Sequence, residues 1–235
     1  MKIIPRFHEF ADQETLCREL SQQICVSLQE AIEARGKASL VVSGGSTPVP
    51  LFAALAETSM EWDRVFITLA DERWVDMNDS ASNEAMVREH LICGQAKTAH
   101  FQGLKNSHAS ATAGEKECGE KLARLPVPFD FVILGMGLDG HTASLFPGAD
   151  RLDEALDMNS GKLCLAMTPV TASHERMTLT LPALLRSRRI CFHLTGKEKR
   201  DVYERALAGD SVEKMPVRAV LAQDLAPVDV YWAPK

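Results

Sequence analysis

The feature that most constrains the fold is a series of short apolar runs that alternate with longer segments of helical periodicity. The runs occupy residues 39–43, 64–69, 129–134, 163–167, 190–194 and 228–232. Continuous apolar runs are typical of strands in parallel sheets, because such sheets are covered on both faces. Strands that alternate with helices indicate β-α units. The sequence therefore predicts an α/β protein with a doubly wound, mostly parallel sheet.

The segments between the runs carry helix signals. Asp12 is a candidate N-cap, and apolar residues then recur every four residues from Leu16 to Ile32, until Gly36 provides a stop signal. Further helical segments are expected at residues 51–55, 82–91, 112–125 and 197–207, with another helix start at Pro182. No linker, repeat or charge block divides the chain. We therefore expect a single domain over residues 1–235, with at most a small helical or β excursion.

Composition limits the partners. A net charge of −6 argues against a general polyanion binder, because such binding relies on clustered Lys and Arg. We expect no nucleic-acid partner, although one local basic pocket would suffice for a small phosphorylated ligand. The six cysteines form no C-x-x-C pair, which favours reduced thiols. We also expect no metal, because the histidines show no ligand spacing.

The apolar runs are too short for a membrane protein. The N-terminal segment, residues 1–6, has no apolar stretch of signal-peptide length. No run approaches the roughly 20 residues that span a bilayer. The sequence therefore predicts a cytoplasmic protein without a membrane partner.

Four polar or glycine-rich motifs begin where predicted strands end. They start at Ser43, Ala70, Gly135 and Thr195. In doubly wound sheets, ligands bind beyond the carboxyl ends of the strands. The coincidence predicts an active site at this edge of the sheet.

The motif SGGSTP (residues 43–48) has two interpretations. Gly44 and Gly45 would let the backbone approach a ligand closely, and Ser46 and Thr47 add hydroxyl groups. A strand, a glycine turn and a helix start together form a plausible phosphate cradle. The alternative is a tight strand-to-helix turn with a Ser or Thr cap, and spacing alone does not separate the two. The pattern matches neither a P-loop nor a serine-nucleophile elbow.

The motif GMGLDGHTASLFPG (residues 135–148) contains the G-x-G-x-x-G spacing of a dinucleotide-binding loop. Its context does not fit that function, because Pro147 and Gly148 would end any helix after Gly140 within two turns. The next strand candidate is followed by Thr168 and carries no ribose-binding acid. What remains is His141 on a glycine-rich turn, where an imidazole that titrates near neutral pH suits general-base catalysis.

Three basic residues are candidates for anion binding. Arg73 could grip an oxyanion or phosphate, with Asp71 orienting it. The alternative for this pair is an exposed loop ion pair of little energetic worth. Arg176 and Lys199 could add fixed positive charge, and the alternative for each is a solvated surface charge.

Taken in order, these motifs resemble the 6-phosphogluconolactonase family, which shares its fold with glucosamine-6-phosphate deaminase and ribose-5-phosphate isomerase. The resembling segments are SGGSTP (43–48), DER (71–73), SN (82–83), GMGLDGHTASLFPG (135–148), RMTLTLP (176–182) and TGKEK (195–199). The resemblance implies a three-layer, Rossmann-like sheet of the sugar-phosphate isomerase/deaminase type. It also implies an ester hydrolase of the oxidative pentose phosphate pathway that converts 6-phospho-D-glucono-1,5-lactone to 6-phosphogluconate without a cofactor.

The resemblance also assigns roles to residues. The family's base falls on His141, and its phosphate-binding loop falls on residues 44–47. The basic contacts fall on Arg73, Arg176 and Lys199. In the mechanism that we expect, Asp71 orients Arg73 or the hydroxyl groups of the substrate.

Two comparisons refine this expectation. Deaminase relatives continue after the Gly-His with an Asn-Glu-Pro segment, whereas residues 144–147 here supply no acid, which favours the lactonase. The segment 169–175 departs from the proline-rich lead-in of many lactonases, and it leaves room for His174 near the substrate. A hexosamine-phosphate deaminase or isomerase, and a non-enzymatic sugar-phosphate sensor, remain as alternatives.

Overall fold

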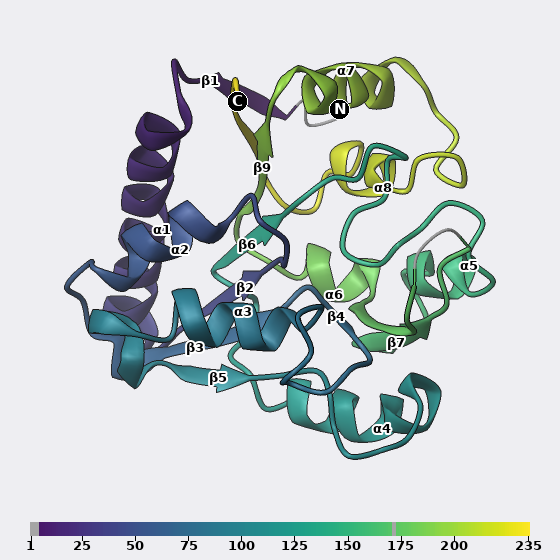
Figure 1. The fold of residues 1–235 in the computed structure, drawn as a ribbon, viewed down its shortest axis with the longest axis horizontal. Helices are drawn as coiled ribbons and strands as arrows, with labels where there is room; N and C mark the ends of the chain where they lie inside the picture. The colour runs from purple at the N-terminus through teal and green to yellow at the C-terminus, as the bar shows by residue number, and fades with distance from the viewer. Residues whose placement is uncertain (1–4, 171–172) are drawn as a thin grey trace.

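The structure is a computed structural model that describes residues 5–170 and 173–235. Its main sheet has seven strands in the order β1-β10-β9-β6-β2-β3-β5, and every neighbouring pair is parallel (Figure 1). The strands are β1 (Arg6–Glu9), β2 (Ala38–Val42), β3 (Val65–Leu69), β5 (His100–Gln102), β6 (Phe131–Leu134), β9 (Ile190–Thr195) and β10 (Val228–Ala233). The predicted α/β fold with a doubly wound, mostly parallel sheet is confirmed.

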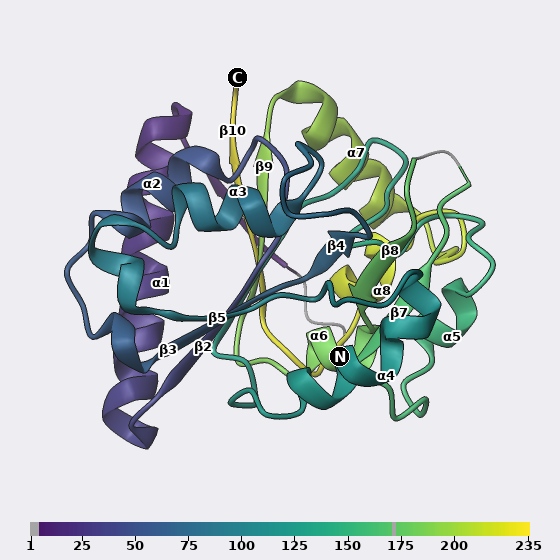
Figure 2. The same ribbon diagram turned by 60° about the horizontal axis from the view of Figure 1, so that its bottom comes forward.

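Helices cover both faces of this sheet. They are α1 (Gln13–Arg35), α2 (Val49–Ala56), α3 (Asn83–His90), α4 (Ala111–Leu122), α5 (Leu152–Leu156), α6 (Leu181–Leu185), α7 (Lys197–Ala208) and α8 (Val217–Leu221), with short 3₁₀ turns η1 (Trp62–Arg64) and η2 (Gly94–Thr98). Figure 2 shows α1 and α2 on one side of the sheet and α6 and α8 on the other. The main-sheet strands therefore lie between two layers of helices, as the three-layer expectation requires.

The first helix forms for the reasons its sequence indicated. The Asp12 carboxylate accepts a hydrogen bond from the Thr15 amide at 2.7 Å, and Gly36 ends the helix with φ of 75°. About once per turn the helix buries an apolar side chain, so that the stripe from Leu16 to Ile32 faces the sheet. The cap satisfies a backbone donor that the helix leaves unpaired, and the left-handed turn suits glycine.

A second, smaller sheet stands beside the main one. It has three antiparallel strands in the order β4-β8-β7, namely β4 (Asp71–Arg73), β8 (Arg176–Leu179) and β7 (Cys164–Met167). The strand at 163–167 was predicted, but residues 71–74 were expected only as a strand end or a loop. That loop expectation is wrong, because the segment pairs with β8 and is largely buried. The small sheet is the β form of the helical or β excursion that the sequence left open.

Several short elements were not predicted. Strands β1 and β5 lie at the two edges of the main sheet, where each pairs on one side only and is partly exposed. Such strands need no continuous apolar run, so they give no signal of the kind used above. The same holds for α5 and α8, which have five residues each.

The strand order of the main sheet changes direction between the neighbouring strands β2 and β6. From β2 the chain proceeds to β3 and β5, and from β6 it proceeds to β9 and β10 on the other side. Because the connections leave these two neighbours in opposite directions, a crevice opens at their carboxyl ends.

Two other expectations can be set beside the structure. Cys17, Cys118, Cys164 and Cys191 are buried and Cys25 and Cys93 half-buried, all as free thiols. Within residues 5–170 and 173–235, no helix combines the length and the apolar character needed to cross a bilayer. The first four residues, which belong to the segment considered for a signal peptide, lie outside the described residues.

Candidate active site

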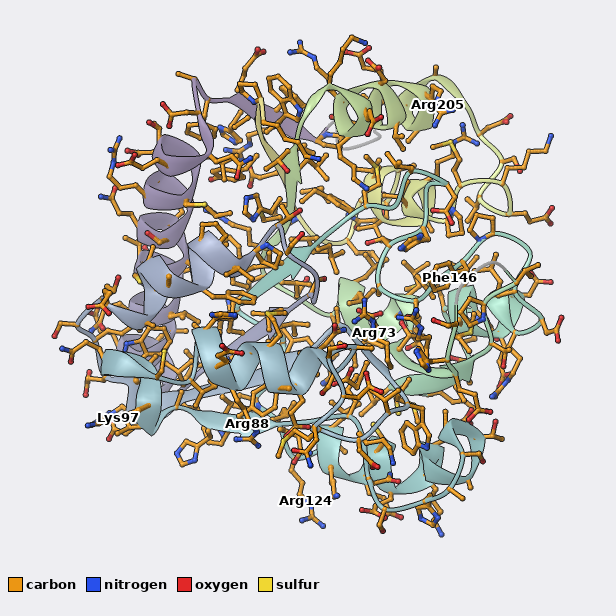
Figure 3. All side chains as sticks on the ribbon, in the orientation of Figure 1. Arg73, Arg88, Lys97, Arg124, Phe146 and Arg205 are labelled. Carbon is orange, nitrogen blue, oxygen red and sulfur yellow. The ribbon has the colours of Figure 1, made fainter. Side chains whose placement is uncertain are left out.

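A cavity of about 930 Å³ opens at the crevice between β2 and β6. The loops after β2, β6 and β9 form one wall, which we call the loop wall, and residues of β4 and β8 form another, which we call the strand wall. All the predicted site residues line this cavity: Gly44, Gly45, Ser46, Thr47, Asp71, Arg73, His141, Arg176 and Lys199. In the view of Figure 3, Arg73 and Phe146 lie toward the middle of the molecule, whereas Lys97 and Arg124 lie at its edge.

The turn after β2 depends on its two glycines. Gly45 has φ of 96°, a left-handed conformation that favours glycine. A Cβ on Gly44 would lie 1.9 Å from the Asn83 side-chain oxygen. Among the described residues, the amides of residues 44–47 donate no hydrogen bond to another backbone group. The turn thus presents backbone donors at the cavity and begins α2, as the phosphate-cradle interpretation requires.

The turn after β6 does not continue into a helix. The amide of Gly137 donates to the His141 carbonyl at 2.8 Å, and Gly140 adopts φ of 84°. A Cβ on Gly137 would lie 2.1 Å from the His141 ring. The glycines therefore make room for the histidine in a closed turn. They do not start the helix on which a dinucleotide pyrophosphate would bind, and the cofactor interpretation of this spacing is rejected.

His141 has a carboxylate partner that was not predicted. Its Nδ1 lies 2.6 Å from Asp139 Oδ1, and the same oxygen accepts the His141 amide at 3.1 Å. Burial alone would raise the pKa of Asp139, but the hydrogen bonds and charge of His141 hold this pKa below its ordinary value. An ionised carboxylate can only accept, so Nδ1 carries the proton and Nε2 is left as the basic nitrogen. The spacing Asp-x-His was visible in the sequence and could have revealed this pair.

The face of the His141 ring is covered by Phe146. The ring centroids are 4.2 Å apart with an interplanar angle of 35°. The Arg176 guanidinium lies 5.8 Å from the centroid of the same phenyl ring. Phe146 thus fixes the tilt of the imidazole and places an apolar group, not an acid, beside it.

The strand wall carries two arginines, of which Arg176 is buried and Arg73 is half-buried. Pairing of β4 with β8 places Arg73 opposite Arg176. Among the described residues, the hydrogen bonds of the two guanidinium groups go to carbonyl oxygens: Arg73 Nη1 donates to Ala81 at 2.5 Å and Arg176 Nη2 donates to Ser173 at 3.3 Å. The Nε atoms of both are buried without a partner among the described residues. Burial lowers the pKa of Arg176, which Asp71 opposes. Two adjacent cations with unused donors favour an anionic ligand.

The strand wall also holds Asp71, which is 8% exposed. Its Oδ2 accepts a hydrogen bond from Ser144 Oγ at 2.6 Å. Within the described residues it forms no hydrogen bond with the Arg73 side chain, so the structure gives no support to the idea that Asp71 orients that arginine. Asp71 lines the cavity together with the two arginines.

Lys199 lies in the first turn of α7 and contacts the turn after β6 that carries His141. Its Nζ donates to the Met136 carbonyl at 2.5 Å. Burial lowers the pKa of this lysine, and Asp139 opposes that effect. Nearby Lys197, by contrast, is 83% exposed and pairs with Asp201. Both lysines line the cavity, but Lys199 is anchored to the turn that carries His141, whereas the Lys197 side chain is mostly exposed and bound to Asp201.

Not every candidate joins the site. His174 is exposed and does not line the cavity. Residues 171–172 of the variant lead-in loop lie outside the described residues. His193, which was not predicted, lines the cavity from β9 with both ring nitrogens unpartnered among the described residues. The described residues hold no group of three or more His, Cys, Asp or Glu suited to a metal, and the absence of a metal stays a prediction.

Comparison with known proteins places this site in a family. The sequence model described as "Glucosamine-6-phosphate isomerases/6-phosphogluconolactonase" matches residues 11–232. A 6-phosphogluconolactonase of Pseudomonas putida is 38% identical over 97% of this chain and 93% of its own length, and one of Mesorhizobium japonicum is 39% identical over 97% and 95%.

Solved structures agree. A crystal structure of a 6-phosphogluconolactonase from Shewanella baltica is 50% identical, with a TM-score of 0.96 over 99% of this chain and 100% of that one. A monomeric glucosamine-6-phosphate deaminase has a TM-score of 0.80 at 16% identity, which shows a shared fold alone. The predicted resemblance is confirmed: the chain belongs to the glucosamine-6-phosphate isomerase/6-phosphogluconolactonase family.

Proposed function

We propose that this chain is a 6-phosphogluconolactonase, which hydrolyses 6-phospho-D-glucono-1,5-lactone to 6-phosphogluconate, the second step of the oxidative pentose phosphate pathway. The observation that carries the proposal is a histidine held by a carboxylate, His141 with Asp139, in a cavity whose strand wall carries two arginines with unused donors. A base and an anion-binding surface in one cavity suit hydrolysis of a phosphorylated lactone. The similarity to named lactonases supports the same activity.

His141 acts as the base in this mechanism. Its neutral Nε2 takes a proton from water while the water oxygen attacks C1 of the lactone. Asp139 stabilises the resulting imidazolium through Nδ1–H. When the C1–O5 bond breaks, the imidazolium returns the proton to the ring oxygen, and the product acid then loses its proton to solvent.

The phosphate binds at the turn formed by residues 44–47, where unused backbone amides face the cavity, with Lys199 and Arg176 adding positive charge. Arg73 or a loop amide stabilises the oxyanion on C1. Asp71 faces the hydroxyl groups of the sugar. Because Lys199 and the two arginines come from different sides of the His141 turn, positive charge reaches the ligand from both walls.

Phe146 disfavours a deaminase. It supplies an apolar ring beside His141, within the segment where the deaminase relatives are expected to carry an acid. We further propose that the chain works as one domain over residues 1–235, in the cytoplasm, without nucleic-acid or membrane partners. Its net charge of −6 supports the absence of a nucleic-acid partner.

The test compares wild-type protein with His141→Ala on freshly generated lactone, corrected for spontaneous opening. Loss of the base should lower kcat by about 10²–10⁴-fold. A parallel assay measures ammonia release from glucosamine-6-phosphate, which we expect to be absent. A wild-type-like kcat in the folded His141→Ala protein would remove His141 from its role, and ammonia release would replace the lactonase with a deaminase.

A further inference from the structure

Glu72 is a buried carboxylate that lies outside the cavity. It is 1% exposed and occupies the middle of β4, between Asp71 and Arg73. Because side chains alternate along a strand, the two neighbours face the cavity while Glu72 points the other way. There it meets the first turn of α3.

The Glu72 carboxylate gathers hydrogen bonds from two segments. Its Oε1 accepts from the amides of Arg73 at 2.7 Å and Asn83 at 2.8 Å, and its Oε2 accepts from the amide of Glu84 at 2.7 Å. Ser82 Oγ lies 3.5 Å from Oε2. The three amide donors and the helix N-terminus favour the ionised carboxylate, although burial outweighs them and raises the pKa of Glu72. The same carboxylate binds the backbone of an adjacent strand residue and that of the helix start.

The residues that Glu72 joins form two further links to the site. Arg73 Nη1 donates to the Ala81 carbonyl at 2.5 Å, just before α3 begins. Asn83 Nδ2 donates to the Asp71 carbonyl at 2.9 Å, and its side chain packs against Gly44. The Arg73 backbone is therefore linked to the start of α3 through the Glu72 carboxylate, and the Arg73 guanidinium is linked to it through Ala81. Glu72 holds the start of the helix in place.

We propose that Glu72 is a positioning residue for the reaction: its carboxylate locks β4 to α3 and thereby holds Arg73 at the height in the cavity where it meets the substrate. The inference rests on the proposed function for its kinetic part only. Glu72 does not line the cavity. It acts through Arg73, and through Asn83 it has a second, weaker effect on the Gly44 turn. A shift of about 1 Å in a group that contacts the reacting atoms is enough to cost about 100-fold in rate.

The experiment is a double-mutant cycle. Glu72→Gln keeps the shape but replaces one acceptor oxygen with a donor, and Glu72→Ala removes both oxygens. Each is measured for kcat and KM in the wild-type background and in an Arg73→Ala background. We expect Glu72→Gln to lower kcat/KM by about 10-fold or more alone and by less than about 2-fold when Arg73 is already absent, because coupled residues are not additive.

Two control variants separate positioning from general loss of stability. Val87→Ala creates a cavity under the same helix, because Val87 is fully buried, and should lower Tm while kcat and KM remain unchanged. Glu89→Gln makes the same chemical change on the exposed side of α3, where the Glu89 side chain is 74% exposed, and should change neither. Equal losses for Glu72→Gln in both Arg73 backgrounds, or a Val87→Ala protein with the same kinetic defect, would overturn the proposal.

A second measurement does not depend on activity. Amide hydrogen exchange by NMR should show that Arg73, Asn83 and Glu84 are protected in the wild type and lose protection in Glu72→Ala, but keep it in Glu89→Gln. If the wild type fails to hydrolyse the lactone, the proposed function falls while this measurement still tests the link that Glu72 makes. Unchanged exchange at all three amides would overturn the positioning role itself.

Discussion

The two walls of the cavity are built by different means. The loop wall comes from turns at the ends of parallel strands, where glycines bring the backbone close and His141 stands on a closed turn. The strand wall comes from paired antiparallel strands, where register places Arg73 opposite Arg176. Turns supply backbone donors and a base held by local hydrogen bonds. Paired strands hold the Arg73 and Arg176 guanidinium groups in fixed positions. On a flexible loop, the same groups would be free to turn toward solvent or to pair with a carboxylate.

The largest expected effect is on the loop wall. Asp139→Asn should lower kcat by about 100-fold or more with little change in KM, because an amide no longer holds the Nδ1–H tautomer or stabilises the imidazolium. Steady-state kinetics with the lactone checks this. If KM rises while kcat stays unchanged, Asp139 belongs to substrate binding, and the division of labour between the walls fails.

The next effect is on the pH dependence of stability. It compares Glu72, a buried acid behind the strand wall, with His193, a buried base on β9. Burial raises the pKa of Glu72 from 4.5 to about 7, and burial lowers the pKa of His193 from 6.5 to about 4. The stability that follows from the raised pKa of Glu72 is full below pH 4.5 and is lost as pH rises through 7. The stability that follows from the lowered pKa of His193 is full above pH 6.5 and is lost as pH falls through 4. Each shift corresponds to about 3 kcal/mol.

Urea unfolding between pH 4 and 7.5 separates the two. Relative to Glu72→Gln, the wild type should lose stability as pH rises. Relative to His193→Leu, it should lose stability as pH falls. In the wild type itself the two contributions oppose each other. Parallel curves for a variant and the wild type would mean that the substituted group does not change its protonation on folding in this range.

On the strand wall, Arg176→Lys keeps the charge but loses the planar fork. We expect KM to rise by about 10-fold or more and kcat to fall less, because a lysine cannot make the same pair of hydrogen bonds to a phosphate. Calorimetric binding of 6-phosphogluconate should weaken by a similar factor. Unchanged product affinity would assign the phosphate to the loop wall alone.

The smallest effect is expected for Lys199→Ala, which should raise KM by a few-fold to about 10-fold and leave kcat near the wild-type value. Lys197→Ala is the matched control, because Lys197 also borders the cavity but is exposed and paired with Asp201. Similar kinetics for the two variants would show that Lys199 adds no specific contact from the loop wall.

Much of the loop wall was predictable and little of the strand wall was. The glycine turns and His141 follow long apolar strands, so both the strand and the special turn leave a local pattern. Asp139 had such a pattern in Asp-x-His and was overlooked. Arg73 and Arg176 were named as candidates, but nothing local distinguishes them from solvated charges; their burial follows from the pairing of β4 with β8.

By itself, the sequence determined the succession of the longer strands and helices along the chain, the parallel arrangement of the main sheet, and the glycine-rich turns at its edge. These follow from hydrophobic periodicity and from glycine, which act over a few residues. Only the tertiary structure decided that a short segment after β3 joins a second sheet. It also decided that Glu72 is buried against α3, that His193 lies unpartnered beside the cavity, and that two arginines face one ligand space. Those features depend on which distant segments meet, and the free energy of burying a charge is set by the groups that surround it after the chain has folded.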